Sequence, residues 1–358
     1  MSNSLIIKKI FSIIFGCCIG LFLAETATRI LLPTSHPSKG LLRSVPNDAI
    51  AFEYIPNIEI GDVKINDLGF RDDPFPLQKD ASEVRILWLG DSIVMGWGVA
   101  KEERFTDILN FKLKEQNPKI RTINMAVESY SNYQELLVLH RRGITANPNV
   151  VILGFCWNDI LKYEHFVDTS GTNRFVLQND SKGIENGNLL RVRSFQYIFK
   201  YSRFLDLARN SISKLVRNLH HSDNKDKNKA TFSEFLDWYL NAWESQQLDT
   251  LHTQILTMKK IASTINAKFI IVIIPLSIQV EQDLEYEKYL ARIDNIQENF
   301  YQYCLLHDIN VYDLKPGLLQ MSRTDHRSLF LDIWHLNKTG HKIAADLIYT
   351  DLKKKNIF

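Results

Sequence analysis

Apolar runs of strand length alternate with helical patterns along most of the chain after residue 83. Five such runs occur, at residues 84–89, 121–126, 150–155, 268–274 and 309–312. Helical patterns lie between or after them, at residues 102–116, 283–306 and 338–354. Apolar strands that alternate with helices are typical of a parallel sheet with both faces covered. The pattern therefore predicts an α/β fold built on a five-stranded parallel sheet.

The N-terminal residues carry a different pattern, in which two charges precede an apolar run. Lys8 and Lys9 come directly before the uncharged residues 10–24. A spanning helix needs about 20 apolar residues, and residues 5–7 extend the run if the two lysines snorkel. We expect residues 1–32 to form an uncleaved transmembrane anchor, with the N-terminus inside and the rest of the chain outside. A cleaved signal peptide is the alternative, although the small residues that cleavage requires fit poorly here.

The remainder of the chain divides into an extension and one large domain. Residues 33–83 are rich in Pro, Asn and Asp, and we expect a linker that becomes an ordered N-terminal extension. The predicted domain covers residues 84–358 and is interrupted by a helical insertion at about residues 161–261. Within this insertion, Thr231 and Glu234 form a capping-box pattern before an aromatic helix. That helix either packs on the domain or serves as a lid.

Composition and charge exclude several classes of protein. Hydrophobic residues make up 45% and charged residues 23%, which is normal for a folded protein. Lys and Arg number 43 against 41 Asp and Glu, a net charge of +2, so no basic excess indicates a nucleic-acid partner. The chain has 4 Cys, too few for a disulfide scaffold, and we expect Cys156 and Cys304 to be free in the core.

The sequence also lacks the common signatures of cofactor binding. Gly96 and Gly98 are not followed by the third glycine of a dinucleotide fingerprint, and no Gly-x-x-x-x-Gly-Lys segment occurs. His220 and His221 lie in a polar stretch without a pattern of further metal ligands. We therefore expect no cofactor and no catalytic metal.

Candidate chemistry begins where the first strand of the domain ends. Gly90, Asp91 and Ser92 leave that strand and enter the next element. Backbone N–H groups and the helix dipole favour negative charge at such a point, as on the oxyanion of an acyl intermediate. A serine hydroxyl needs a base, usually a histidine that a carboxylate orients. Asp332 and His335 supply that pair, because three residues apart they can face one another within a turn.

Two further strand ends carry polar groups. Asn158 follows the third strand, and the turn that contains Ser129 follows the second. The carboxyl ends of parallel strands form the edge where open α/β sheets bind ligands. These residues are therefore expected to meet Ser92 at one edge of the sheet.

In these residues the sequence resembles the SGNH (GDSL-type) hydrolases, and in particular their membrane-anchored bacterial members. Gly90-Asp91-Ser92, Asn158-Asp159 and Asp332-x-x-His335 occur in the family's order, and the resemblance covers residues 84–160 and 262–356. It implies a three-layer αβα, flavodoxin-like fold. It also implies that Ser92 is the nucleophile, His335 the general base and acid, and Asp332 its orienter. The implied oxyanion hole consists of the backbone N–H groups of Ser92 and Ser129 and the side chain of Asn158.

The chain departs from the family at two of these places. Ser129 stands where the family usually has Gly, and serine tolerates positive φ less well than glycine. Cys156 stands where the family often has Gly, two positions before the asparagine. The spacing of Asn66, Gly69 and Arg71 in turn resembles the extensions of the membrane-anchored relatives.

The resemblance implies a serine ester hydrolase that cleaves an acyl ester, such as an O-acetyl, glycan-linked or lipid-linked ester, through an acyl-enzyme. With the anchor, it implies a domain held at the membrane in the periplasm. Two alternatives stay open. The same three residues could pass the acyl group to an extracytoplasmic glycan as an O-acyltransferase, or the fold could serve as a non-catalytic binding or assembly module.

Overall fold

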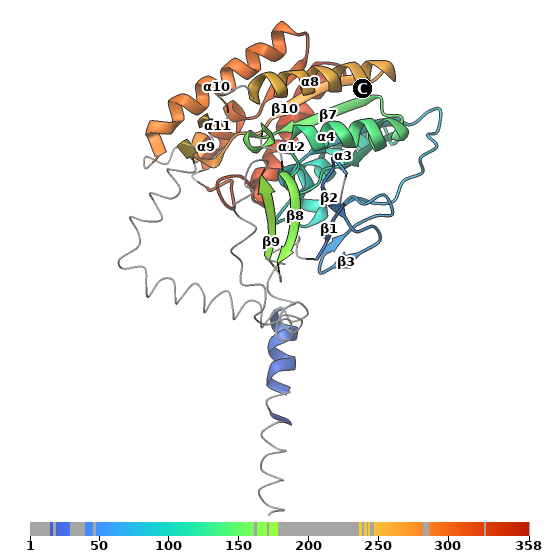
Figure 1. The fold of residues 1–358 in the computed structure, drawn as a ribbon, viewed down its shortest axis with the longest axis vertical. Helices are drawn as coiled ribbons and strands as arrows, with labels where there is room; N and C mark the ends of the chain where they lie inside the picture. The colour runs from blue at the N-terminus through green and yellow to red at the C-terminus, as the bar shows by residue number, and fades with distance from the viewer. Residues whose placement is uncertain are drawn as a thin grey trace, which may run out of the picture. The chain divides into compact units, whose positions relative to one another are not determined.

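A five-stranded parallel sheet forms the core of the main compact unit, and its strands β7 and β10 are labelled in Figure 1. The computed structural model describes residues 15–16, 19–28, 40–45, 48–160, 163–169, 172–177, 236–237, 240–241, 243, 247–281, 286–325 and 327–357. The fold belongs to one compact unit, formed by the described parts of residues 36–168, 173–183 and 235–358. Residues 1–14, the His220-His221 pair and the capping box of Thr231 and Glu234 lie outside the described residues.

The strands of the sheet follow the predicted apolar runs. They are β5 (Val84–Gly90), β6 (Ile120–Asn124), β7 (Val150–Phe155), β10 (Lys268–Ile273) and β11 (Asn310–Asp313). Their order in space is β11-β10-β7-β5-β6, and every pairing is parallel. This order, with the first strand second from one edge, is the flavodoxin-like arrangement. The expected α/β fold with a five-stranded parallel sheet is thus confirmed.

Helices cover both faces of the sheet, which explains why β5 and β7 are apolar at nearly every position. Consecutive side chains of β5 point to opposite faces. Trp88 packs edge to face on Phe105 of α3 (Phe105–Gln116), with ring centroids 5.2 Å apart. Leu87 lies against Gly143, in the helical turn after α4 (Asn132–Val138). The sheet therefore lies between two helical layers.

The first layer consists of α3, α11 (Lys315–Asp325) and α12 (Lys338–Lys354), with α12 in contact with both others. The second contains α4, α8 (Gln247–Thr264) and α10 (Glu287–Leu306). His252 of α8 stacks on Tyr303 of α10, so these two helices lie side by side (Figure 1).

Short elements complete the unit. The antiparallel pairs are β1 (Leu42–Ser44) with β2 (Phe52–Tyr54), and β3 (Glu59–Ile60) with β4 (Val63–Lys64). The strands β8 (Tyr163–Thr169) and β9 (Thr172–Leu177) form another two-stranded sheet. The short helices are α2 (Ser92–Met95), η1 (Lys101–Glu103), η2 (Leu139–Gly143), η3 (Ile144–Ala146), η4 (Trp157–Ile160) and α9 (Ser277–Glu281).

The segment 161–261, expected to be a helical insertion, contains more than helix. The strands β8 and β9 lie in this segment, and its pattern of apolar and polar residues did not predict them. Helix α8 begins inside it and packs on α4 and β10 of the main sheet. Cys156 and Cys304 are buried and free, as predicted.

Residues 19–28 are helical and belong to a separate unit of the chain. Among the described residues, no helix combines the length and the hydropathy that crossing a membrane requires. The predicted anchor at residues 1–32 lies largely outside the described residues.

Candidate active site

Ser92 is the first residue of α2, which follows strand β5 with only Asp91 between them. The preceding Asp91 caps this helix, and its side chain accepts a hydrogen bond of 2.8 Å from the backbone N–H of Ile93. Gly90 makes the sharp turn possible with φ of +156°, and a Cβ there would overlap the side chain of Val94. The local sequence thus places the serine hydroxyl at the carboxyl edge of the sheet.

In the structure, Ser92, His335 and Asp332 are linked by successive hydrogen bonds. Ser92 Oγ lies 2.9 Å from His335 Nε2. His335 Nδ1 lies 2.8 Å from Asp332 Oδ2 and 3.0 Å from Oδ1. This is the arrangement in which a carboxylate holds an imidazole so that its far nitrogen faces a serine hydroxyl.

The loop that carries Asp332 and His335 is closed on itself by main-chain contacts. Phe330 and Leu336 form a β-bridge, and Leu331 N donates to His335 O at 2.7 Å. Asp332 Oδ1 accepts the backbone N–H groups of Trp334 and His335, each at 2.8 Å. Burial alone would raise the pKa of Asp332, but the hydrogen bonds and the charge of His335 outweigh it, so the pKa is lowered. Asp332 is therefore an anionic partner for His335 near neutral pH.

Trp97 closes one side of this group. Its ring lies against the imidazole of His335, with centroids 4.4 Å apart and an interplanar angle of 33°. No sequence pattern predicts this contact, because Trp97 lies in a loop between two glycines and far from His335 along the chain.

The residues expected to form the oxyanion hole also lie at this edge. Asn158 is in η4, directly after β7, and its Nδ2 donates to Asp91 Oδ2 at 2.7 Å. One N–H of that amide is thereby used, and the second remains to point elsewhere. Ser129 lies in the turn between β6 and α4, which begins where Val127 N donates to Gly90 O at 3.1 Å. Its φ of +59° is the left-handed conformation expected for the family's glycine.

Cys156, the other departure, fits without displacing the site. Its side chain is fully buried, and its backbone N–H donates to Asp159 Oδ2 at 2.7 Å. Burial, with the nearby carboxyls of Asp91 and Asp159, raises the pKa of the thiol well above its usual range. The thiol is therefore a packing group.

A cluster of three buried carboxyls lies behind the serine, and sequence analysis missed it. The cluster consists of Asp91, Glu135 and Asp159, each about 1% exposed. Burial and mutual repulsion raise the pKa of Glu135 and of Asp159 well above the usual range. Both carboxyl oxygens of Glu135 lack a hydrogen-bond partner. Glu135 lies in the first turn of α4, where acidic residues are common. No sequence pattern therefore marks it as a member of a buried cluster.

Within the described ranges, no group of three His, Cys, Asp or Glu side chains has an arrangement that could hold a metal ion.

Known proteins resemble this chain in sequence profile and in fold. The family model described as "GDSL-like Lipase/Acylhydrolase family" matches residues 88–343. A search of curated proteins found no significant match.

Among solved structures, a putative acylhydrolase from Bacteroides fragilis is 13% identical, with a TM-score of 0.39, and covers 78% of this chain and 90% of its own. The acetyl xylan esterase AlAXEase is 15% identical, with a TM-score of 0.38 and coverage of 75% and 100%. The esterase EstA from Pseudoalteromonas sp. is 13% identical, with a TM-score of 0.39 and coverage of 76% and 99%.

The family match includes both the segment that bears Ser92 and the segment that bears His335. It confirms the expectation that this protein is an enzyme acting on ester bonds. The chain belongs to the GDSL-like lipase/acylhydrolase family.

Proposed function

We propose that this protein hydrolyses a carboxylic ester through an acyl-enzyme formed on Ser92. The observation that carries the proposal is the chain of hydrogen bonds from Ser92 Oγ through His335 to Asp332. A serine hydroxyl becomes a useful nucleophile when a positioned base takes its proton. Here His335 Nε2 lies within hydrogen-bond distance of the Ser92 hydroxyl, so it can take that proton.

The reaction proceeds in two halves. Ser92 Oγ attacks the acyl carbon while its proton passes to His335 Nε2, and the collapse of the intermediate releases the alcohol with that proton. Water then attacks the acyl carbon and gives a proton to His335 Nε2. The bond between the acyl carbon and Ser92 Oγ breaks, His335 returns the proton to Oγ, and the carboxylic acid leaves. Asp332 keeps the imidazole in the tautomer whose Nε2 accepts, and it stabilises the imidazolium.

The oxyanion that forms in each half needs donors. We assign this role to the backbone N–H groups of Ser92 and Ser129 and to the second N–H of the Asn158 amide. The left-handed backbone at Ser129 and the bond that fixes Asn158 to Asp91 support this assignment. Removal of one such donor typically lowers kcat by about 10²- to 10³-fold. The substrate class we propose is an acyl ester on a glycan or a lipid, with O-acetyl the smallest case.

The test compares the wild type with Ser92→Ala on a short-chain chromogenic ester. We expect kcat to fall by about 10⁴-fold or more, since the nucleophile is lost. A phosphonate should label the wild type on Ser92 and leave the variant unlabelled. An inert wild type, or equal activity in the variant, contradicts the proposal. Product analysis with an added glycan separates hydrolysis from transfer to a sugar hydroxyl.

We further propose that residues 1–32 tether the enzyme to a membrane, with the catalytic unit on the extracytoplasmic side. The support is the pair Lys8 and Lys9 before an apolar run, together with the exposure of apolar side chains such as Phe22 and Leu23 on the helix at 19–28. Full-length protein should stay with membranes after an alkaline carbonate wash, whereas protein that lacks residues 1–32 should be released. Release of both forms contradicts the tether, and a processed N-terminus indicates a signal peptide.

A further inference from the structure

The N-terminal extension contacts the turn that contains Ser129. The phenol of Tyr54, in β2, is fully buried, and its Oη accepts the backbone N–H of Glu128 at 3.2 Å. On the other side of Ser129, Tyr130 Oη donates to the carbonyl of Phe52 at 2.8 Å. The rings of Phe52 and Tyr130 pack edge to face, with centroids 5.3 Å apart. Both neighbours of Ser129 are therefore bonded to β2.

This attachment coincides with a strained backbone. Ser129 has φ of +59°, a conformation that costs a residue with a Cβ more than it costs glycine. Residues in such conformations persist when the surrounding structure fixes them. Here the hydrogen bonds at positions 128 and 130 supply that constraint, and both lead to the extension.

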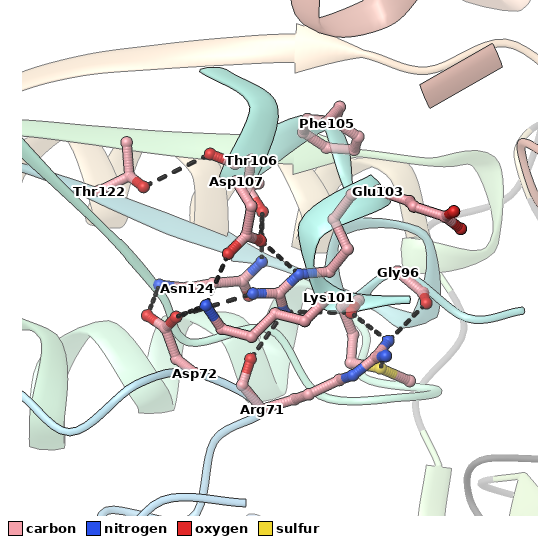
Figure 2. Close-up of polar contacts among 12 residues, drawn as sticks. Arg71, Asp72, Gly96, Lys101, Glu103, Phe105, Thr106, Asp107, Thr122 and Asn124 are labelled. Atoms are coloured by element: carbon pink, nitrogen blue, oxygen red, sulfur yellow. Dashed lines mark hydrogen bonds and ion pairs between the residues drawn. The ribbon is translucent and has the colours of Figure 1, made fainter. Parts of the chain in front are cut away.

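The extension also binds the loop that follows α2. The guanidinium of Arg71 is buried and donates to three main-chain carbonyls of this loop, those of Met95 at 3.3 Å, Gly96 at 2.7 Å and Val99 at 2.9 Å. Figure 2 shows Arg71 pointing at Gly96 from below the loop. Arg104 also links the extension to this loop, since its Nη1 donates to Arg71 O at 2.6 Å and to Met95 O at 3.2 Å.

The loop bound by Arg71 is the one that carries Trp97, whose ring lies against His335. Gly96 and Gly98, on either side of Trp97, both have left-handed backbones, with φ of +82° and +80°. Glycines in these positions give the loop little stiffness of its own. The bonds from Arg71 therefore add to the bond from Trp97 N to Ser92 O (2.9 Å) in holding the loop that places the indole against the imidazole.

We propose that the extension positions the catalytic site, through Tyr54 acting on the Ser129 turn and Arg71 acting on the Trp97 loop. This inference rests on the proposed function, because its consequence is a loss of turnover in ester hydrolysis. Tyr54 and Arg71 are positioning residues, which act through Ser129 and Trp97 and do not touch the reacting atoms. The extension is thus part of the enzyme's working site as well as the connection to the N-terminal segment.

A purely stabilising role for the extension makes a different prediction. It would lower the amount of folded enzyme and leave the turnover of each folded molecule unchanged. Active sites are therefore counted with a phosphonate that labels Ser92, and kcat is expressed per labelled site.

The first variant is Tyr54→Phe, which removes one hydroxyl and keeps the ring. We expect kcat to fall about tenfold with KM unchanged, short of the ~100-fold loss that follows outright removal of an oxyanion donor. In a Ser129→Gly background the left-handed turn is less strained, so the effect of Tyr54→Phe should shrink to about twofold. If Tyr54→Phe does not fold, Tyr130→Phe tests the same turn through its other bond.

The second variant is Arg71→Lys, since an ammonium cannot span the three carbonyls that a planar guanidinium reaches. We expect kcat per site to fall about tenfold, because the loop that holds Trp97 against His335 is released. Arg85→Lys is the matched control. Arg85 is also buried and donates to carbonyls, including those of Pro76 and Ala146, but it lies near the start of β5, at the opposite end of the strand from Ser92. Tyr303→Phe controls for loss of a phenol hydroxyl between α8 and α10.

The outcomes separate the two proposals. A wild type without ester hydrolysis refutes the proposed function, and the positioning role falls with it. If the wild type is active but the Tyr54→Phe and Arg71→Lys variants match their controls in kcat per site, only the positioning role is refuted. A penalty for Tyr54→Phe that is equally large in the Ser129→Gly background also refutes it, because Tyr54 would then not act through that turn.

Discussion

Replacement of Asp332 by asparagine tests whether its carboxylate sets the tautomer of His335. In the native loop, Asp332 Oδ1 accepts two backbone N–H groups, from Trp334 and His335, while Oδ2 faces His335 Nδ1 at 2.8 Å. An asparagine keeps these backbone bonds only if its carbonyl oxygen takes the Oδ1 position. Its NH₂ group then takes the position of Oδ2, the oxygen nearer to Nδ1 (2.8 Å, against 3.0 Å for Oδ1), which favours Nδ1 as an acceptor. The proton moves to Nε2, and Nε2 can no longer take a proton from Ser92.

The size of the effect follows from the alternatives open to this side chain. A flipped amide would restore the tautomer but lose two backbone hydrogen bonds, at about 1 kcal/mol each, and turn its NH₂ toward two N–H groups. The wrong tautomer is therefore the favoured state. In a buried triad the same change lowers kcat by about 10⁴-fold. The Asp332 side chain is 40% exposed, so water offsets part of the loss, and we expect about 10³-fold, equivalent to about 4 kcal/mol.

The assay is hydrolysis of a chromogenic ester, with kcat expressed per site labelled by phosphonate. Asp80→Asn is the matched control, because Asp80 Oδ1 also accepts a backbone N–H two residues ahead, from Ser82, on the exposed surface. We expect the control to match the wild type. A screened surface charge is worth at most about 1 kcal/mol, or roughly fivefold in rate. If Asp332→Asn costs no more than that, the carboxylate does not set the tautomer and the role proposed for Asp332 is wrong.

Two further predictions concern stability. Burial, and then the charge of Asp91, raise the pKa of Glu135 well above its ordinary value of 4.5, so the folded state holds this proton more tightly than the unfolded chain. Wild type should therefore lose unfolding free energy as pH rises above about 4.5, and Glu135→Gln should show a smaller loss between about pH 5 and pH 8 in urea titrations; equal losses contradict this. A Cβ at Gly340 would overlap the carbonyl oxygen of Leu329, in the loop that leads to Asp332. Gly340→Ala should lower the free energy of unfolding by about 1–3 kcal/mol, and an unchanged thermal midpoint contradicts that.

The inner strands of the sheet were predictable because β5, β7 and β10 are apolar at nearly every position, as strands covered on both faces are. The strands β5, β7 and β10 are bounded to within one residue of the predicted runs, since polar or turn residues end them sharply. Helix starts were less certain. The pattern at 102–116 becomes a helix only at Phe105, after the 3₁₀ turn η1. In the pattern at 283–306, helix α10 covers Glu287–Leu306, and residues 283–285 lie outside the described residues. A helical period continues into capping residues that do not adopt the helical backbone.

The three residues of the proposed triad were predictable for a local reason and a topological one. Asp332 and His335 are close in sequence, so a single closed loop suffices to make them meet. Ser92 and Asn158 follow parallel strands that neighbour each other, so the topology brings both to one edge. The contacts of Tyr54 with Glu128 and of Arg71 with Gly96 have neither advantage. They join loops and a three-residue strand that are far apart along the chain. No sequence pattern distinguishes a tyrosine in such a short strand that positions another residue from one that only packs.

The two departures from the family pattern bear on whether the fold still catalyses. At Ser129 the side chain differs, but the left-handed backbone of the family's glycine is kept, at a cost of about 1 kcal/mol or more. At Cys156 the added thiol is buried, and the backbone N–H is bonded to Asp159. Neither change removes a donor from the oxyanion hole that we propose. The hydrogen bonds that join Ser92, His335 and Asp332, together with the preserved turn at Ser129, therefore favour the catalytic hypothesis over the non-catalytic one.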